Sequence, residues 1–293
     1  MRKCFAIEFE TPKRYLLNGL WFGGDEAKKA LVFVQGLGGT TFGLHDLVAP
    51  LASEETAVIY FGNRGHDKVA KIKKINRRTK KGYESHLVGE NHEVFTDCVD
   101  DIQGIVDFLR NKGVKDIHLV GHSTGCQKSI YFLSKPRKQK FIRSVTLLCP
   151  ISDYASVGLF TNKDELTRSI AEAQKMVEKG NAHDILPKDL NLTGHDAQRF
   201  LSLYTPDSAE EIFTYAHNKK PITLQKVKTP SFYVFAGSDE YNDRPTQEIS
   251  KWFENNSKAD NYKVSIIKNA LHGFQEKEGE VNKVLRGWLK QFN

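Results

Sequence analysis

Short apolar runs alternate with amphipathic segments along most of the chain, and this alternation predicts the class of fold. Apolar and β-branched runs typical of buried strands occur at 30–34, 56–61, 116–120, 144–149, 231–236 and 262–267. Residues 91–112 form a predicted helix, which Gly113 would end, and its core positions are Val94, Cys98, Ile102, Ile105, Val106 and Leu109. Strands that alternate with helices predict an α/β fold with a mostly parallel central sheet flanked by helices. Before them, alternating segments at 4–9 and 16–22 predict a hairpin at the sheet edge.

The strand–helix alternation stops between residues 152 and 227. This stretch contains a charged helix at 163–179, a second helix at 196–203, and a third helix predicted after Pro206 that includes Glu210, Glu211 and Phe213. We therefore predict a core made of residues 1–151 and 228–293, with a helical insertion at 152–227. Apolar side chains of the insertion either line a pocket or anchor it on the sheet, and they are Leu159, Phe160, Met176, Phe200, Leu203 and Tyr204.

The composition is that of an ordinary globular enzyme. Of 293 residues, 39% are hydrophobic and 27% charged, and no apolar run is long enough to cross a membrane. The first residues alternate as an edge strand does and lack the apolar core of a signal peptide. The four cysteines have neither metal-site spacing nor disulfide density, and Cys126 and Cys149 lie in apolar segments as buried thiols. We expect a cytoplasmic protein without a metal, and a homodimer is left open.

The net charge of +7 is concentrated in one segment. Between residues 68 and 81 lie Lys71, Lys73, Lys74, Arg77, Arg78, Lys80 and Lys81, without an acidic residue among them. A solvated loop is the simplest interpretation, and attraction of an acidic substrate is the alternative. A nucleic-acid partner is not expected, because no aromatic residues interleave these charges as a single-strand binding surface requires.

Residues Gly121-His122-Ser123-Thr124-Gly125 stand between a predicted strand and a predicted helix. A Gly-x-Ser-x-Gly sequence in this context is typical of a nucleophile elbow, which exposes the serine hydroxyl above the sheet. The turn is so tight that a side chain at either glycine would collide with a neighbouring element. Ser123 is therefore the candidate nucleophile.

A nucleophilic serine needs a base and an acid that orients it, and in this architecture they follow in the order serine, acid, histidine. Asp239 follows the strand 231–236, and His272 follows the strand 262–267. Both would lie at the carboxyl ends of strands, where open α/β sheets bind ligands. Asp239 has rivals as the acid, namely Asp153, Glu240 and Asp243.

The strand 30–34 opens into Gln35-Gly36-Leu37-Gly38-Gly39-Thr40. A loop at this place supplies one backbone N–H of an oxyanion hole, and the residue after the nucleophile supplies the other. This assigns Leu37 and Thr124, with Gly38 as the neighbouring alternative. The loop does not fit a dinucleotide fingerprint, because Thr41 stands where the third glycine is required. Gly36 and Gly38 are also candidate substrate contacts, together with Phe160 and Tyr204 of the insertion.

From about Ala30 to Phe292, the chain resembles the α/β-hydrolase superfamily. Besides the ordered motifs, Asn63-Arg64-Gly65-His66-Asp67 is similar to the superfamily's Asp-x-Arg-Gly-His-Gly loop. The sequence from Gly121 to Gln127 and Asp239-Glu240-Tyr241 resemble the siderophore (fusarinine-type) esterases. One departure is Gln35-Gly36, where many members carry His-Gly. The resemblance implies an α/β-hydrolase fold with a helical lid over the active site, and a hydroxamate-type siderophore ester as substrate.

These residues predict a serine esterase that cleaves carboxylic esters through an acyl-enzyme and needs no cofactor. The basic segment and the aromatic lid would also suit an aromatic or acidic acyl group such as a hydroxycinnamate. A thioesterase, an amidase or an acyltransferase could use the same triad. A non-catalytic ligand-binding protein on this fold is the remaining alternative, although it would have no use for a complete set of catalytic groups.

Overall fold

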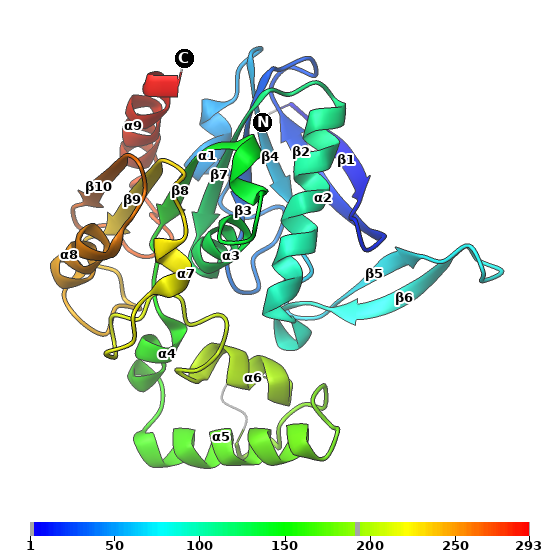
Figure 1. Ribbon diagram of the computed structural model, residues 1–293, viewed down its shortest axis with the longest axis vertical. Helices are drawn as coiled ribbons and strands as arrows, with labels where there is room; N and C mark the ends of the chain where they lie inside the picture. The colour runs from blue at the N-terminus through cyan, green and yellow to red at the C-terminus, as the bar shows by residue number, and fades with distance from the viewer. Residues whose placement is uncertain (1–2, 191–193, 293) are drawn as a thin grey trace.

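A mixed sheet of ten strands forms the centre of the computed structural model, which describes residues 3–190 and 194–292. The parallel part runs in the order β10-β9-β8-β7-β3-β4 and coincides with the predicted buried strands (Figure 1). These strands are β3 (Lys29–Val34), β4 (Thr56–Phe61), β7 (Asp116–His122), β8 (Ile142–Leu148), β9 (Ser231–Ala236) and β10 (Tyr262–Ile267). The predicted N-terminal hairpin also forms, since β1 (Cys4–Glu10) pairs antiparallel with β2 (Tyr15–Phe22).

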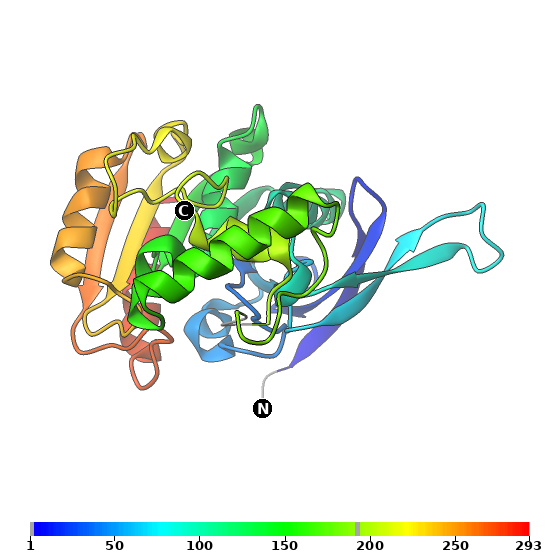
Figure 2. The same ribbon diagram turned by 90° about the horizontal axis from the view of Figure 1, so that it is seen from below.

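Helices cover both faces of this sheet (Figures 1 and 2). One hydrophobic core packs α2 (Cys98–Asn111), α3 (Thr124–Leu133) and α8 (Thr246–Asn256) against one face. A second core packs α1 (His45–Val48) and α9 (Glu278–Leu289) against the other face. Short 3-10 helices occur at Ala49–Leu51, Glu90–His92, Phe95–Asp97, Lys138–Phe141, Val157–Leu159 and Lys290–Phe292. The α/β class and the mostly parallel sheet are as predicted.

The helix predicted over 91–112 begins later, at Cys98. Residues 90–97 form two 3-10 turns instead, and Val94, predicted to lie in the core, is 37% exposed. The other predicted core positions of this helix are buried. Glu93 explains the break in the helix, because its carboxylate enters a buried cluster of charges rather than facing solvent.

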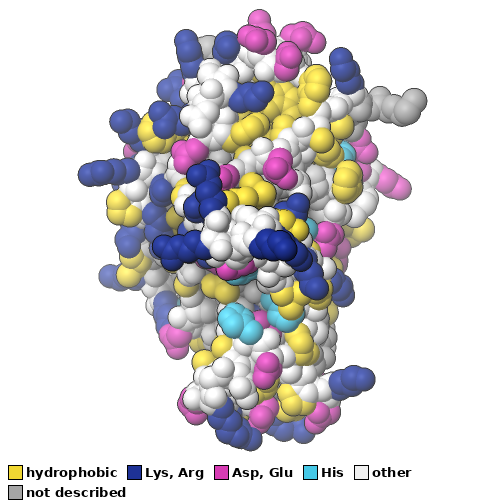
Figure 3. Space-filling view, turned by 90° about the vertical axis from the view of Figure 1, so that its right-hand side faces the viewer, with side chains coloured by type: hydrophobic (Ala, Val, Ile, Leu, Met, Phe, Trp, Pro, Cys, Tyr) yellow, Lys and Arg dark blue, Asp and Glu magenta, His cyan; other side chains and the backbone are white. Residues whose placement is uncertain are grey.

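The basic segment is not the loop that its charges suggested. Residues of β5 (Ala70–Ile75) pair with β6 (Tyr83–Val88), and the two strands form an arm that projects from the body of the molecule (Figures 1 and 2). Cross-strand contacts stabilise it, including Lys74 opposite Glu84 and the Lys73 ammonium over the Tyr83 ring. Lys and Arg side chains gather around the arm in the view toward it (Figure 3).

The insertion lies below the sheet in Figure 1 and contains α4 (Asp153–Ser156), α5 (Lys163–Glu178), α6 (Ala197–Tyr204) and α7 (Ile222–Gln225). Residues 191–193 of the predicted insertion lie outside the described residues. The third helix predicted after Pro206 is wrong: residues 206–210 form turns, residues 211–213 have no regular structure, and Glu210 is buried against Arg199. Within the described residues, every helix falls short of the length and hydrophobicity that a membrane span needs.

Candidate active site

Ser123 occupies a strained turn between β7 and α3. Its backbone angles are φ 54° and ψ −128°, a region that residues with a side chain rarely adopt. The flanking glycines make the turn possible. A Cβ atom at Gly121 would lie 2.5 Å from the carbonyl oxygen of Gly125, and one at Gly125 would overlap the carbonyl of Val34. The elbow geometry predicted from the glycines is present.

Asp239 and His272 meet although 33 residues separate them. Asp239 lies in the loop after β9, and His272 lies in the loop after the neighbouring β10. The Nδ1 atom of His272 is 2.8 Å from one Asp239 carboxylate oxygen and 3.0 Å from the other. Because the acceptor is a carboxylate, Nδ1 carries the proton, which leaves Nε2 as the basic nitrogen. Of the four acids considered, Asp239 is the one whose carboxylate contacts this imidazole.

The backbone of His272 is held on both sides by residues whose role the motifs did not reveal. Glu240 accepts a hydrogen bond from the His272 backbone N–H at 2.9 Å. His122 Nε2 lies 2.9 Å from the His272 carbonyl oxygen, so Nε2 is its donor. Burial and the neighbouring His272 lower the pKa of His122 to about 4, which keeps this ring neutral. The rings of His122 and Tyr241 both pack against the His272 imidazole, with centroids 5.1 and 4.8 Å away.

The glycine-rich loop after β3 lies directly on the elbow. A Cβ atom at Gly36 would stand 2.8 Å from Ser123 Cβ, so only glycine permits this approach. Gly38 has a left-handed φ of 59°. Leu37 lines the same pocket as Ser123, and its side chain packs against the hydrophobic cluster of the insertion. Thr124 is the first residue of α3, where backbone N–H groups lack a partner within the helix. Leu37 thus shares a pocket wall with Ser123, and Thr124 follows Ser123 in the chain.

A pocket of about 370 Å³, called here the catalytic pocket, contains Ser123 and His272 in its wall. Its described lining residues are Phe33, Gln35, Gly36, Leu37, Gly38, Gly39, Thr40, Gly43, Leu44, His122, Ser123, Ile151, Asp153, Tyr241 and His272. Asp153 faces it from the start of α4, and Gln127 of α3 donates a 3.0 Å hydrogen bond to its carboxylate. Gln35 replaces the superfamily's histidine here, and its buried Nε2 has no hydrogen-bond partner among the described residues.

Two predicted substrate contacts lie elsewhere. Phe160 is 63% exposed and touches the pocket only through the ring of Tyr241, 5.7 Å away. Tyr204 is buried in the insertion's own core against Phe200. The apolar residues of α5 and α6 thus pack mainly among themselves.

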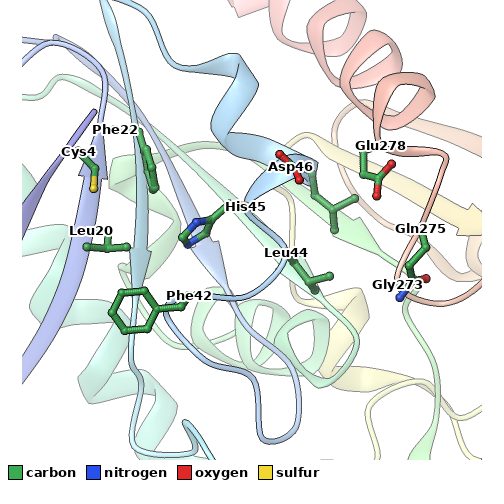
Figure 4. Close-up of a pocket in the computed structure, with 11 residues that line it drawn as sticks. Cys4, Leu20, Phe22, Phe42, Leu44, His45, Asp46, Gly273, Gln275 and Glu278 are labelled. Carbon is green, nitrogen blue, oxygen red and sulfur yellow. The ribbon is translucent and has the colours of Figure 1, made fainter. Parts of the chain in front are cut away.

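A second, larger cavity of about 900 Å³ adjoins the catalytic pocket. Leu44 lines both, and Gly273, which follows His272 in the chain, belongs to the wall of the larger one (Figure 4). Phe22, Phe42 and Leu20 supply its apolar side, and Asp46 and Glu278 lie at the other end in the same view.

Behind the pocket, a cluster of buried charges joins the insertion to the core. Lys128 of α3 pairs with Glu93 at 2.6 Å, and Arg199 of α6 pairs with Glu93 at 2.9 Å and with Glu210 at 2.5 Å. Lys128 and Arg199 are fully buried. Burial and the Glu210 carboxylate together raise the pKa of Asp153 to about 7, even though Arg199 opposes this.

One group of described residues has the composition of a metal site. Ligand atoms of Cys149, Asp239 and His272 lie within 4.8 Å of one another. The Asp239 carboxylate already accepts from His272, and burial raises the pKa of the Cys149 thiol well above its ordinary value. A metal requires the thiolate, so this environment fits a hydrogen-bonded His–Asp pair better than a metal centre.

Residues 91–291 match the model of a family described as a protein of unknown function, DUF1749. No curated protein matches the chain. Among solved structures, DcsB in complex with its substrate analogue is 15% identical, with a TM-score of 0.69 and 99% of each chain covered. The siderophore hydrolase EstB from Aspergillus fumigatus is 19% identical, with a TM-score of 0.63 and 99% of each chain covered. Est1E from Butyrivibrio proteoclasticus, solved with ferulic acid, is 13% identical, with a TM-score of 0.58 and coverage of 97% of this chain and 98% of its own. These similarities confirm the predicted α/β-hydrolase fold.

Proposed function

The chain belongs to the DUF1749 family, whose description assigns no activity, and from its site we propose that it is a serine hydrolase of carboxylic esters. The observation that supports this most is the contact of His272 Nδ1 with Asp239, in a pocket that also contains the strained Ser123. The structural neighbour EstB, which is named as a siderophore hydrolase, agrees with the proposal.

In the proposed reaction, Ser123 Oγ attacks the ester carbonyl carbon while His272 Nε2 accepts the hydroxyl proton. Asp239 stabilises the imidazolium that forms. The backbone N–H groups of Leu37 and Thr124 donate hydrogen bonds to the oxyanion of the tetrahedral intermediate. These hydrogen bonds become stronger as negative charge develops on that oxygen. The imidazolium then protonates the leaving alcohol, and a water molecule cleaves the acyl-enzyme by the same sequence.

We further propose that residues 152–227 act as a lid whose base is fixed. Leu37 packs against the hydrophobic cluster of this insertion, and Arg199 links the insertion to Glu93 of the core. A lid anchored in this way would position the oxyanion loop as well as cover the pocket. A siderophore-type or hydroxycinnamoyl ester remains a proposal for the substrate.

A fluorophosphonate probe tests the nucleophile directly, because it labels activated serines. Wild-type protein should be labelled, and Ser123→Ala should not. Ser129, which is buried in α3, supplies a matched control, since Ser129→Ala should leave labelling intact. Folded wild-type protein that resists the probe would favour a non-catalytic binding protein. A panel of acyl esters of increasing length would then define the acyl preference, and a competing alcohol nucleophile would distinguish hydrolysis from acyl transfer.

A further inference from the structure

We propose that Asp153 binds an amine of the substrate, so that the catalytic pocket selects esters that carry an ammonium group over neutral or anionic ones. This inference rests on the proposed function, because it assigns the substrate class of the same pocket. The sequence offers Asp153 as a rival of Asp239 for the catalytic acid, but Asp239 is the carboxylate that contacts His272. Asp153, the carboxylate in the wall of the pocket, is therefore available for another role.

The charges of the pocket wall favour a cation. Of its described lining residues, Asp153 is the only carboxylate, and none is a lysine or an arginine. In the adjoining cavity, the described lining again includes carboxylates, Asp46 and Glu278, and neither lysine nor arginine. The protein's net charge of +7 thus lies elsewhere, largely on the β5–β6 arm. An anionic acyl group would meet no cation in either cavity.

Asp153 is held in place by groups that do not neutralise it. Both protons of the Gln127 amide are used, one on the Ile151 carbonyl at 2.9 Å and one on Asp153 Oδ2 at 3.0 Å. Arg199 lies behind the pocket and makes its ion pairs with Glu93 and Glu210. The hydrogen bond from Gln127 therefore fixes the orientation of the Asp153 carboxylate. Among the described residues, no cation lies within salt-bridge distance of it.

A ligand cation would satisfy this carboxylate. Burial and Glu210 raise the pKa of Asp153, which means that the ionised form lacks stabilisation in the free protein. An ammonium group would supply it through charge-assisted hydrogen bonds, which are stronger than those between neutral groups. A buried Gln35 Nε2, without a partner among the described residues, offers a further polar contact in the same pocket. The proposed substrate is thus an ester whose amine reaches Asp153 while its carbonyl lies at Ser123.

Three ethyl esters of nearly equal size test this preference. Ethyl 3-aminopropanoate carries an ammonium group at about pH 8, ethyl butanoate carries a methyl group in its place, and monoethyl succinate carries a carboxylate. We expect kcat/KM to fall in that order. In Asp153→Asn, the ratio of the amine ester to the butanoate ester should fall by about 10- to 100-fold, the usual effect of losing a hydrogen bond to a charged group. Asp116→Asn is the matched control, because Asp116 lies at the opposite end of β7 from Ser123, and it should leave the ratio unchanged.

Binding to catalytically silent protein separates this inference from the proposed function. Calorimetry with Ser123→Ala should show tighter binding of ethyl 3-aminopropanoate than of ethyl butanoate, and the difference should vanish in Ser123→Ala with Asp153→Asn. Equal binding of the two esters by Ser123→Ala, or an unchanged ratio in Asp153→Asn, would overturn the role of Asp153 while leaving esterase activity intact. Amine-selective binding without any ester turnover would instead support the site and refute the hydrolase. If Asp153→Asn fails to fold, Asp153→Ser serves the same comparison. The preference of the wild-type protein among the three esters also tests the proposal, because equal kcat/KM values for the amine and butanoate esters would contradict it.

Discussion

Replacement of Arg199 by methionine would test whether the buried charges hold the insertion onto the core. Arg199 is fully buried and contributes two ion pairs, to Glu93 and to Glu210. With Lys128, the cluster contains two cations and two carboxylates, so its formal charge is zero. Methionine keeps an unbranched apolar stem but removes the guanidinium, which leaves a net negative charge in the interior.

The magnitude follows from these contacts. At an effective dielectric constant near 20, each pair is worth about 6 kcal/mol of gross Coulomb attraction, most of which is offset by desolvation of the charges. Removal of one partner leaves the desolvation without its compensation. The expected loss is therefore about 3–5 kcal/mol of the free energy of unfolding. Arg143→Met is the control: Arg143 pairs with Asp116 on the surface and is 56% exposed, so its loss should cost no more than about 1 kcal/mol.

The loss should also depend on pH. Burial alone would raise the pKa of Glu93, but Lys128 and Arg199 lower it below its ordinary value. Without Arg199, we expect burial, the largest of these effects, to raise that pKa above its value in the unfolded protein. A carboxyl whose pKa is higher in the folded than in the unfolded protein contributes stability at low pH and loses it as the pH rises through the folded pKa. The deficit of Arg199→Met should therefore be larger at about pH 8 than at about pH 5.

Urea unfolding followed by circular dichroism measures both quantities, with Arg199→Met, Arg143→Met and wild-type protein compared at the two pH values. A loss of stability in Arg199→Met no greater than that in Arg143→Met would contradict the role of the buried charges. A larger loss in acid than in base would also contradict it, because the uncompensated group would then not be a carboxylate.

Three further predictions concern the site and its surroundings. Asp239→Asn should lower kcat/KM by about 1,000- to 10,000-fold in an ester assay with the fold retained, because the imidazole loses the acceptor that fixes its tautomer; a loss below about tenfold would assign the acid elsewhere. Gly125→Ala should lower the free energy of unfolding, measured in urea, by at least about 1–3 kcal/mol, since its Cβ would overlap the Val34 carbonyl. Gly287→Ala in α9 is the control and should be neutral or stabilising, because open space surrounds that position. Glu211→Gln should gain stability relative to wild type as the pH rises from about 5 to about 9. Burial and Asp153 raise the pKa of Glu211 to about 8 despite the hydrogen bond from Ser152, so the wild-type protein loses stability as the pH rises toward this value. Parallel curves of stability against pH for the two proteins would contradict this.

The candidate catalytic residues share a property that explains why the sequence brings them forward. Ser123, Asp239 and His272 each lie shortly after a strand of the parallel sheet, and adjacent parallel strands end at one edge of the sheet. Local glycines then fix each turn. The position of these side chains is thus determined by short segments and by topology, both of which leave a pattern in the sequence.

The errors arise where long-range contacts override local pattern. The many lysines of β5 obscure the alternation of apolar and polar residues that is typical of a strand. Its partner β6 follows only after an intervening turn. The helix expected after Pro206 gives way to turns, in which Glu210 accepts hydrogen bonds from Arg199 and Ser202. No sequence pattern marks Lys128 and Glu93 as buried, because nothing in their neighbours reveals that each meets an opposite charge from another element.

This cluster changes how the insertion should be understood. Lys128 lies in α3, five residues after Ser123, and through Glu93 it connects that helix to Arg199 of the insertion. Leu37, in the loop after β3, packs against the hydrophobic cluster of the same insertion, and Asp153 of its first helix faces the catalytic pocket. The helix after Ser123 and the glycine-rich loop thus both contact the insertion, and the pocket's carboxylate belongs to it. We therefore expect Arg199→Met to reduce ester turnover under conditions in which the variant is still folded. An insertion that only covered the pocket would not produce this loss.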